Sequence, residues 1–153
     1  MKESKFRKVL ALYTHHEITL HCNQFEMRQR ENEEDIETLL LLKEPAVLKI
    51  AGQKRKGTWI IDHLWIKVPK DRAAYFIRYL PLARKIKIDG DIYQYFYKES
   101  GNPQAGVKAK NIQILKYKKD IAKKYHLQPG QQLSKKTMEK ILLQSNEECA
   151  SQS

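Results

Sequence analysis

The sequence has little cysteine: of its 153 residues only Cys22 and Cys149 are cysteines, and they form no CxxC pair. A disulfide framework or a cysteine-based zinc site is therefore excluded, and a reducing compartment is indicated. Long apolar runs are lacking too, since a run such as Leu39 to Leu42 falls far short of the roughly 20 residues that cross a membrane. The charged stretch Met1 to Lys8 lacks the apolar centre of a signal peptide. We expect a cytoplasmic protein that does not enter membranes.

Catalytic patterns are also lacking. The six glycines are scattered, so no glycine-rich loop is available to hold a phosphate. His16 and His21 stand one residue too far apart for the HExxH zinc motif and would not share a helix face. A two-metal nuclease cluster would need several carboxylates together, and the candidates are Asp62, Asp71, Asp89 and Asp91. Asp71 is better placed to cap a helix, and the Asp89–Gly90–Asp91 segment is typical of a strand bend. We expect no enzyme activity, no metal and no cofactor.

Positive charge is abundant and unevenly distributed. The net charge is +11, from 29 Lys and Arg against 18 Asp and Glu. Residues 1–42 hold 6 basic and 8 acidic residues, residues 43–124 hold 20 and 7, and residues 125–153 hold 3 and 3. An excess confined to one segment needs an anionic partner more than a uniform solubility charge would. Nucleic acid is the first candidate.

Hydrophobic periodicity predicts the elements. Apolar residues repeat at every second position, as in half-buried strands, in five segments: Val9 to Cys22, Ala46 to Lys54, Thr58 to Val68, Arg84 to Tyr97 and Val107 to Leu115. Helical spacing replaces this pattern over Asp71 to Leu80, which Pro81 ends. The acidic segment 23–43 is expected to be a loop that leads into a short helix or strand.

This order predicts the fold. Three strands, a helix and two strands, with Gly90 inside the fourth strand, is the order of an OB-fold, a small five-stranded barrel that binds oligonucleotides on one face. We therefore expect an all-β protein with small α content, whose OB domain spans residues 1–116. Residues 117–153 are expected to form a C-terminal helical extension with a frayed tail, including a basic helix from Lys118 and a helix capped by Ser134.

In two of the expected strands, strict alternation separates the residues that would face the core from those that would face outward. In the third strand Ile60, Leu64, Ile66 and Val68 would face the core, and Trp59, Ile61, His63, Trp65 and Lys67 would face outward. In the fourth strand the outward residues would be Lys85, Lys87, Tyr93, Tyr95 and Tyr97. Aromatic rings on which bases stack, mixed with cations that follow phosphates, are the requirement for binding single strands. The alternative is that the tryptophans are core residues and the tyrosines only good strand formers.

The segment from Thr58 to Leu115 resembles bacterial-type single-stranded DNA-binding proteins (SSB). The resemblance lies in Thr58-Trp59, Leu64 to Lys67, the helix through Tyr79-Leu80, Ile86 to Ile92, a glycine-containing hairpin, and Val107 to Leu115. It implies that Trp59, Trp65 and Tyr97 stack on bases. The chain departs from the family in its Pro81-to-Arg84 turn, its acidic segment 23–43, and a C-terminus that lacks the acidic tip with Phe that recruits other enzymes. Such a divergent protein would fit a plasmid, phage or conjugative element.

The expected function is non-specific binding of single-stranded DNA in replication, recombination or DNA transfer. The expected phosphate contacts are Lys67, Lys85, Lys87, Lys108 and Lys110, with stacking on Trp59, Trp65 and Tyr97 extended to Tyr93 and Tyr95, and His63 beside them. The family resemblance also implies a homo-oligomer or a cooperative array along the strand. Two alternatives remain at this point: an RNA-binding OB protein, and an OB-fold adaptor that binds another protein.

Overall fold

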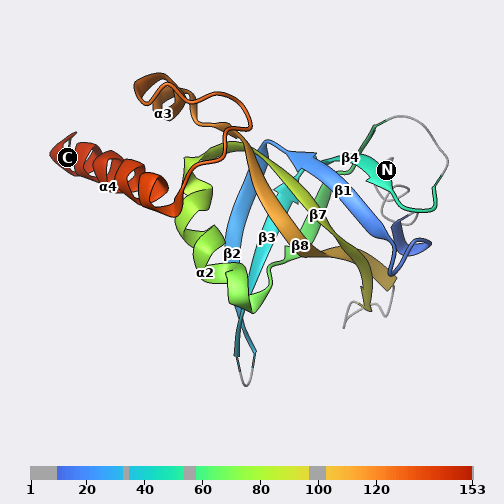
Figure 1. The fold of residues 1–153 in the computed structure, drawn as a ribbon. Helices are drawn as coiled ribbons and strands as arrows, with labels where there is room; N and C mark the ends of the chain where they lie inside the picture. Colours follow the sequence, from blue (N-terminus) through green and yellow to red (C-terminus); the bar gives the residue numbers. More distant parts are fainter. Residues whose placement is uncertain (1–9, 33–34, 54–57, 97–102, 153) are drawn as a thin grey trace.

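The computed structural model describes residues 10–32, 35–53, 58–96 and 103–152, and these form a coiled β-sheet with helices at one end (Figure 1). The strands are β1 (Glu17–Cys22), β2 (Gln24–Asn32), β3 (Asp35–Lys43), β4 (Ala46–Ile50), β5 (Trp59–Ile60), β6 (His63–Lys67), β7 (Ala83–Phe96) and β8 (Pro103–Tyr117). The helices are α2 (Lys70–Tyr79), the 3-10 turn η1 (Leu80–Leu82), α3 (Lys119–Lys124) and α4 (Lys135–Gln152). The prediction of a mostly β protein with a small α content is confirmed.

The prediction of a five-stranded barrel is wrong. The sheet has eight strands in the order β2-β3-β6-β8-β7-β1-β4-β5, which does not close on itself. Bends divide three long extended segments: at Asn23 between β1 and β2, at Glu44 between β3 and β4, and at Asp62 between β5 and β6. Glu44 has a φ of 50°, which lies outside the range of a regular strand.

Two backbone hydrogen bonds hold the sheet together across the last two of these bends. The Glu44 N–H donates to the Asp62 carbonyl at 2.9 Å, and the Ile61 N–H donates to the Pro45 carbonyl at 3.1 Å. They join the end of the β3·β6 pair to the start of the β4·β5 pair. The sheet therefore coils around its apolar side although its ladder is interrupted.

The first predicted strand and the predicted acidic loop both differ from the structure. Residues 10–11 are helical and residues 12–16 form turns, with the Tyr13 N–H donating to the Leu10 carbonyl at 2.9 Å, so the strand begins only at Glu17. Segment 23–43 is a hairpin whose strands pair from Gln24 opposite Lys43 to Asn32 opposite Asp35. Alternation was hard to see there because Leu39 to Leu42 is apolar on both faces of β3.

One apolar face of the sheet makes the main core. The large, fully buried side chains in this cluster include Leu10, Ile18, Leu20, Leu40, Leu42, Ile61, Leu64, Ile66, Ile86 and Ile88. Helix α2 adds Phe76 to this core, and Leu80 follows at the start of η1, where Pro81 ends the α-helical geometry as predicted. The helix predicted over residues 71–80 is confirmed, since α2 spans residues 70–79.

Gly90 lies where two strands approach closely. A Cβ added to Gly90 would lie 2.4 Å from the Lys108 carbonyl oxygen, a backbone atom that cannot move aside easily. The β7·β8 register shifts between Asp89 and Gly90, where β8 has one extra residue, Lys110, so the ladder is irregular beside the point where the sequence predicted a bend.

The C-terminal extension makes a second, smaller core against the end of the sheet where β8 ends. Its buried residues are Tyr79, Leu82, Tyr117, Ile121, Met138 and Ile141. The Ser134 hydroxyl accepts from the Thr137 N–H at 3.2 Å, in keeping with the predicted helix cap. Glu139 of α4 receives hydrogen bonds from both Arg78 and the Tyr79 hydroxyl of α2, the latter at 2.7 Å.

Within the described residues, no helix has the length and apolar character needed to cross a membrane.

Acid should weaken the attachment of α4 to α2. The hydrogen bonds from Arg78 and Tyr79 lower the pKa of Glu139 from 4.5 to about 2. A carboxylate whose folded-state pKa is lowered stabilises the fold above its ordinary pKa, and this contribution is lost as pH falls from about 4.5 towards 2. We expect the melting temperature of Glu139→Gln to fall less than that of the wild type over this window in differential scanning calorimetry. Equal slopes for the two proteins would contradict the ion-pair assignment.

Candidate nucleic-acid interface

The face of the sheet opposite the main core carries the candidate site. On this outer face β6 presents His63, Trp65 and Lys67, β7 presents Lys85, Lys87, Asp89, Asp91 and Tyr93, and β8 presents Lys108 and Lys110. The β6 and β7 side chains are half-buried, whereas Lys108 and Lys110 are exposed. Most of the predicted site residues therefore lie on neighbouring strands of one surface.

Trp65, Gly106 and Tyr93 form the centre of this face. Ile66 pairs in parallel with Val107, so Trp65 lies beside Gly106, the residue before Val107. Gly106 pairs on its other side with Tyr93 of β7. A Cβ on Gly106 would lie 2.7 Å from the Tyr93 ring, so only glycine lets that ring lie against the strand. We call Trp65, Gly106 and Tyr93 the aromatic row.

A cation lies over each ring of the aromatic row. The Arg28 guanidinium carbon of β2 is 5.8 Å from the centroid of the Trp65 ring. The Lys67 ammonium nitrogen is 4.7 Å from the centroid of the Tyr93 ring. Both distances are within the range of cation–π attraction. The row therefore combines two π surfaces with two long, positively charged side chains that can reach beyond it.

Carboxylates neutralise some of the outer-face lysines. Lys67 forms an ion pair with Glu37 at 3.5 Å, and Lys110 forms ion pairs with Glu17 at 3.0 Å and Asp91 at 3.1 Å. Hydrogen bonds to these two carboxylates raise the pKa of Lys110. The predicted phosphate contacts of Lys67 and Lys110 would therefore compete with exposed ion pairs of small energy.

Lys85, Lys87 and Lys108 differ from these two. Within the described residues, none of the three forms an ion pair. Burial lowers the pKa of His21, and the charges of Lys85 and Lys87 lower it further. At the Lys85 end of β7, two lysines that form no ion pair within the described residues therefore lie close enough to His21 to act on it.

The placement predicted for Trp59 is wrong. Trp59 is only 7% exposed and belongs to the main core, whereas its neighbour Ile60, predicted to be in the core, is 61% exposed. The bend at Asp62 reverses the alternation: Trp59 and Ile61 point inward before it, and Leu64 and Ile66 point inward after it. A uniform strand from Thr58 to Val68 would have kept one phase throughout.

Three other predicted site residues remain, of which the structure describes His63 in full, Tyr95 only in its backbone and Tyr97 not at all. His63 lies on the outer face, where its Nδ1 is 2.8 Å from an Asp62 carboxylate oxygen. Tyr95 lies in β7 opposite Gln104, but its side chain is outside what the structure describes. Tyr97 falls outside the described residues altogether. The stacking roles of Tyr95 and Tyr97 stay predictions.

Sequence reasoning missed Arg28 and Gly106. Arg28 was placed in an expected loop, and only recognising β2 as a strand paired with β3 would have brought it to the outer face. Gly106 precedes an alternating segment, and its role depends on pairing with Tyr93, which no local pattern reveals. A glycine next to a predicted strand was the available signal, because it often marks close backbone approach.

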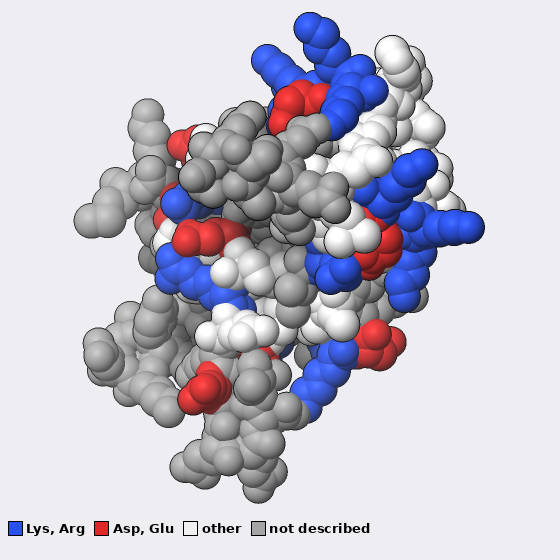
Figure 2. Space-filling model, turned by 90° about the vertical axis from the view of Figure 1, so that its left-hand side faces the viewer, with Lys and Arg blue, Asp and Glu red and all other residues white. Residues whose placement is uncertain are grey.

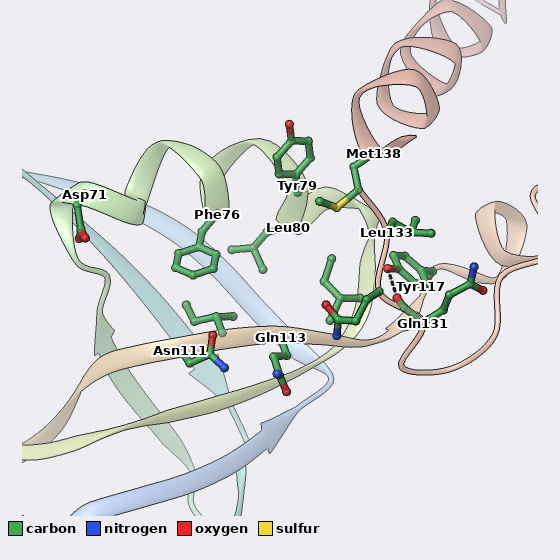
Figure 3. Close-up of a pocket in the computed structure, with 13 residues that line it drawn as sticks. Asp71, Phe76, Tyr79, Leu80, Asn111, Gln113, Tyr117, Gln131, Leu133 and Met138 are labelled. Atoms are coloured by element: carbon green, nitrogen blue, oxygen red, sulfur yellow. Dashed lines mark hydrogen bonds between the residues drawn. The ribbon is translucent and has the colours of Figure 1, made fainter. Parts of the chain in front are cut away.

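A separate groove of about 440 Å³ lies between α2, β8 and the segment that leads into α4 (Figure 3). Phe76, Leu80 and Met138 point into this region, and the Tyr117 hydroxyl donates to the Gln131 carbonyl at 2.7 Å. Asp71 is the one ionisable acid or base among its lining residues apart from tyrosines. A groove lined by uncharged side chains and one carboxylate, without a Lys or Arg, does not suit a polyanion.

In the described part of the chain, no group of three or more His, Cys, Asp and Glu residues could hold a metal ion.

Comparison with known proteins finds similarity among solved structures. No model of a known protein family matches the sequence, and no curated protein matches it. Among solved structures, the chain is similar to a small single-stranded DNA-binding protein from Mycoplasma pneumoniae, with a TM-score of 0.45 and 13% sequence identity. The alignment covers 78% of this chain and 98% of that chain.

Proposed function

We propose that this chain binds single-stranded DNA, without sequence preference and without catalysing a reaction, on the outer face of its sheet. The observation that carries the proposal is the aromatic row, in which Trp65 and Tyr93 flank Gly106 with a cation over each ring. Every base has a π surface, so stacking tolerates any sequence. The biological role would be to protect or organise single strands in DNA replication, recombination or transfer.

Binding would rearrange the cations of the aromatic row. A base that stacks on Trp65 or Tyr93 takes the place now held by Arg28 or Lys67, and the displaced side chain then contacts the adjoining phosphate. Stacking contributes about 1–3 kcal/mol per base. Lys108, which forms no ion pair within the described residues, can contact a phosphate without losing an intramolecular partner. These contacts make affinity depend on salt because counter-ions are released from the strand.

The geometry favours a single strand over a duplex. A duplex reader places a helix or ribbon in a groove, whereas helix α2 packs against the main core through Phe76. Its exposed Arg78 is held by Glu139. By contrast, the aromatic row presents rings that stack only on bases freed from pairing.

Intrinsic tryptophan fluorescence tests the proposal with the full chain. We expect oligo-dT to quench the fluorescence strongly, with a part of the quenching surviving moderate salt, and a duplex of equal length to quench it little. Two single-tryptophan variants sharpen the test. Trp59→Phe, which keeps Trp65, should be quenched like the wild type, whereas Trp65→Phe, which keeps the buried Trp59, should show almost no change.

The contrary outcomes are distinct. If single strand and duplex bind equally and salt abolishes both, the outer face binds nucleic acid only by non-specific charge attraction, and the stacking proposal fails. Tighter binding of a matched RNA oligomer would move the proposal to RNA, because stacking and phosphate contacts do not select deoxyribose. Absence of quenching by every nucleic acid would favour a protein-binding adaptor.

A further inference from the structure

A patch of exposed lysines lies where β8 ends and α3 begins, outside the aromatic row. This α3 lysine patch consists of Lys116, Lys118, Lys119 and Lys123. Figure 2 shows Lys and Arg side chains gathered over α3 at the top of the view. Within the described residues, no ion pair joins any of the four to a carboxylate, and Asp120 is the one acidic residue in α3. The patch carries a net positive charge that the described protein leaves uncompensated.

Packing fixes the direction of these lysines. Ile121 of α3 is buried in the second core, and Ala122 and Tyr125 pack against it. Lys119 and Lys123 are one helical turn apart and lie opposite Ile121, so both point away from the protein. The Lys118 N–H donates to the Leu82 carbonyl at 3.0 Å, which ties the start of α3 to the end of the sheet. The patch is therefore held on a defined platform.

The patch continues the outer face of the sheet. Lys116 lies opposite Lys85 at a point where the β7·β8 register shifts, and Lys87 follows on the same face of β7. Like charges opposite each other in a ladder are destabilising. By contrast, Lys67 and Lys110 near the aromatic row have carboxylate partners. A bound polyanion would relieve the repulsion at the Lys85 end.

From these observations we propose that a single strand stacked on the aromatic row continues along β7, over Lys87 and Lys85, onto the α3 lysine patch. This inference rests on the proposed function and extends it to a second contact surface outside the sheet. Lys85 and Tyr93 are eight residues apart, or about 26 Å at the usual rise of a strand. A very short oligonucleotide would reach only the aromatic row, and a longer one would reach both surfaces.

Two triple variants of the full chain test the extension at equal net charge. One is Lys118→Gln with Lys119→Gln and Lys123→Gln in α3, and the other is Lys135→Gln with Lys136→Gln and Lys140→Gln in α4. Binding of oligo-dT of about 6 and about 20 nucleotides is measured over a series of salt concentrations, since one OB fold contacts about 4–16 nucleotides. The α4 variant controls for the loss of three positive charges.

The expected result is a length-dependent loss. On the long oligonucleotide the α3 variant should bind about tenfold more weakly or worse, and its slope of log affinity against log salt should be less steep by about 2. On the short one it should bind like the wild type, and the α4 variant should match the wild type on both. Equal slopes for wild type and α3 variant, or equal losses at both lengths, would overturn the extension. If the short oligonucleotide fails to quench Trp65 in the wild type, the proposed function itself fails.

Discussion

Replacing Trp65 with alanine is expected to weaken binding of oligo-dT by about ten- to a hundredfold. The stacking of one base on an aromatic side chain contributes about 1–3 kcal/mol, and Trp65 offers the larger ring of the aromatic row. Its ring lies half-buried on the outer face, with Arg28 above it at 5.8 Å. Because the variant loses its fluorescent reporter, the affinity is measured by the anisotropy of a labelled oligonucleotide.

Two further variants separate stacking from surface hydrophobicity. Trp65→Phe keeps an aromatic ring and should lose less affinity than Trp65→Ala. Ile60→Ala removes another large apolar side chain, 61% exposed on β5 and outside the aromatic row, and should bind oligo-dT like the wild type. If Trp65→Ala binds as tightly as the wild type, or if Ile60→Ala is weakened equally, the aromatic row is not the binding site.

The parts of the fold that the sequence predicted well are those with an unambiguous local period. Helix α2 has helical spacing and Pro81 directly after its end, so its limits were predicted to within one residue. β7 alternates cleanly from Ile86 to Ile92, and its outward Lys85, Lys87 and Tyr93 lie where the pattern put them. Alternation assigns faces correctly where the strand is regular.

The errors occurred where the backbone bends. The prediction treated Thr58 to Val68 as one strand, but the bend at Asp62 divides it, so every residue before the bend was assigned to the wrong face. Asp62 carries no local signal as strong as glycine or proline. The acidic segment was missed for a different reason: β2 becomes a strand only through its pairing with β3, and such pairing is a property of tertiary structure.

The family resemblance and the face assignment shared this error at Trp59. Both placed the ring on the binding face, and both assumed a continuous third strand. In the structure the aromatic row instead places Trp65 and Tyr93 on the two sides of Gly106, and this placement depends on the parallel pairing of β6 with β8. Pairing between strands distant in sequence cannot be predicted from either strand alone.

Replacing Trp59 with alanine should therefore affect folding more than binding. Truncating a buried Trp in a core costs about 3–5 kcal/mol, which is a large part of the 5–15 kcal/mol that stabilises a typical domain. β5 has only two residues, with Trp59 opposite Val47 and Ile60 opposite Ala46, so burial of the Trp59 ring is its main attachment. We expect the melting temperature to fall by about 10 °C.

Variants of Trp59 and of Trp65, compared in melting temperature and in affinity, decide whether Trp59 lies in the core or on the binding face. Trp59→Phe keeps most of the buried ring and should recover most of the lost stability, while Trp65→Ala should lower the melting temperature much less than Trp59→Ala. At a temperature where Trp59→Ala is still folded, its affinity for oligo-dT should lie close to that of the wild type. The opposite pattern, a stable Trp59→Ala protein with weakened binding, would place Trp59 on the binding face and show that the strand runs through Asp62 without the reversal seen here.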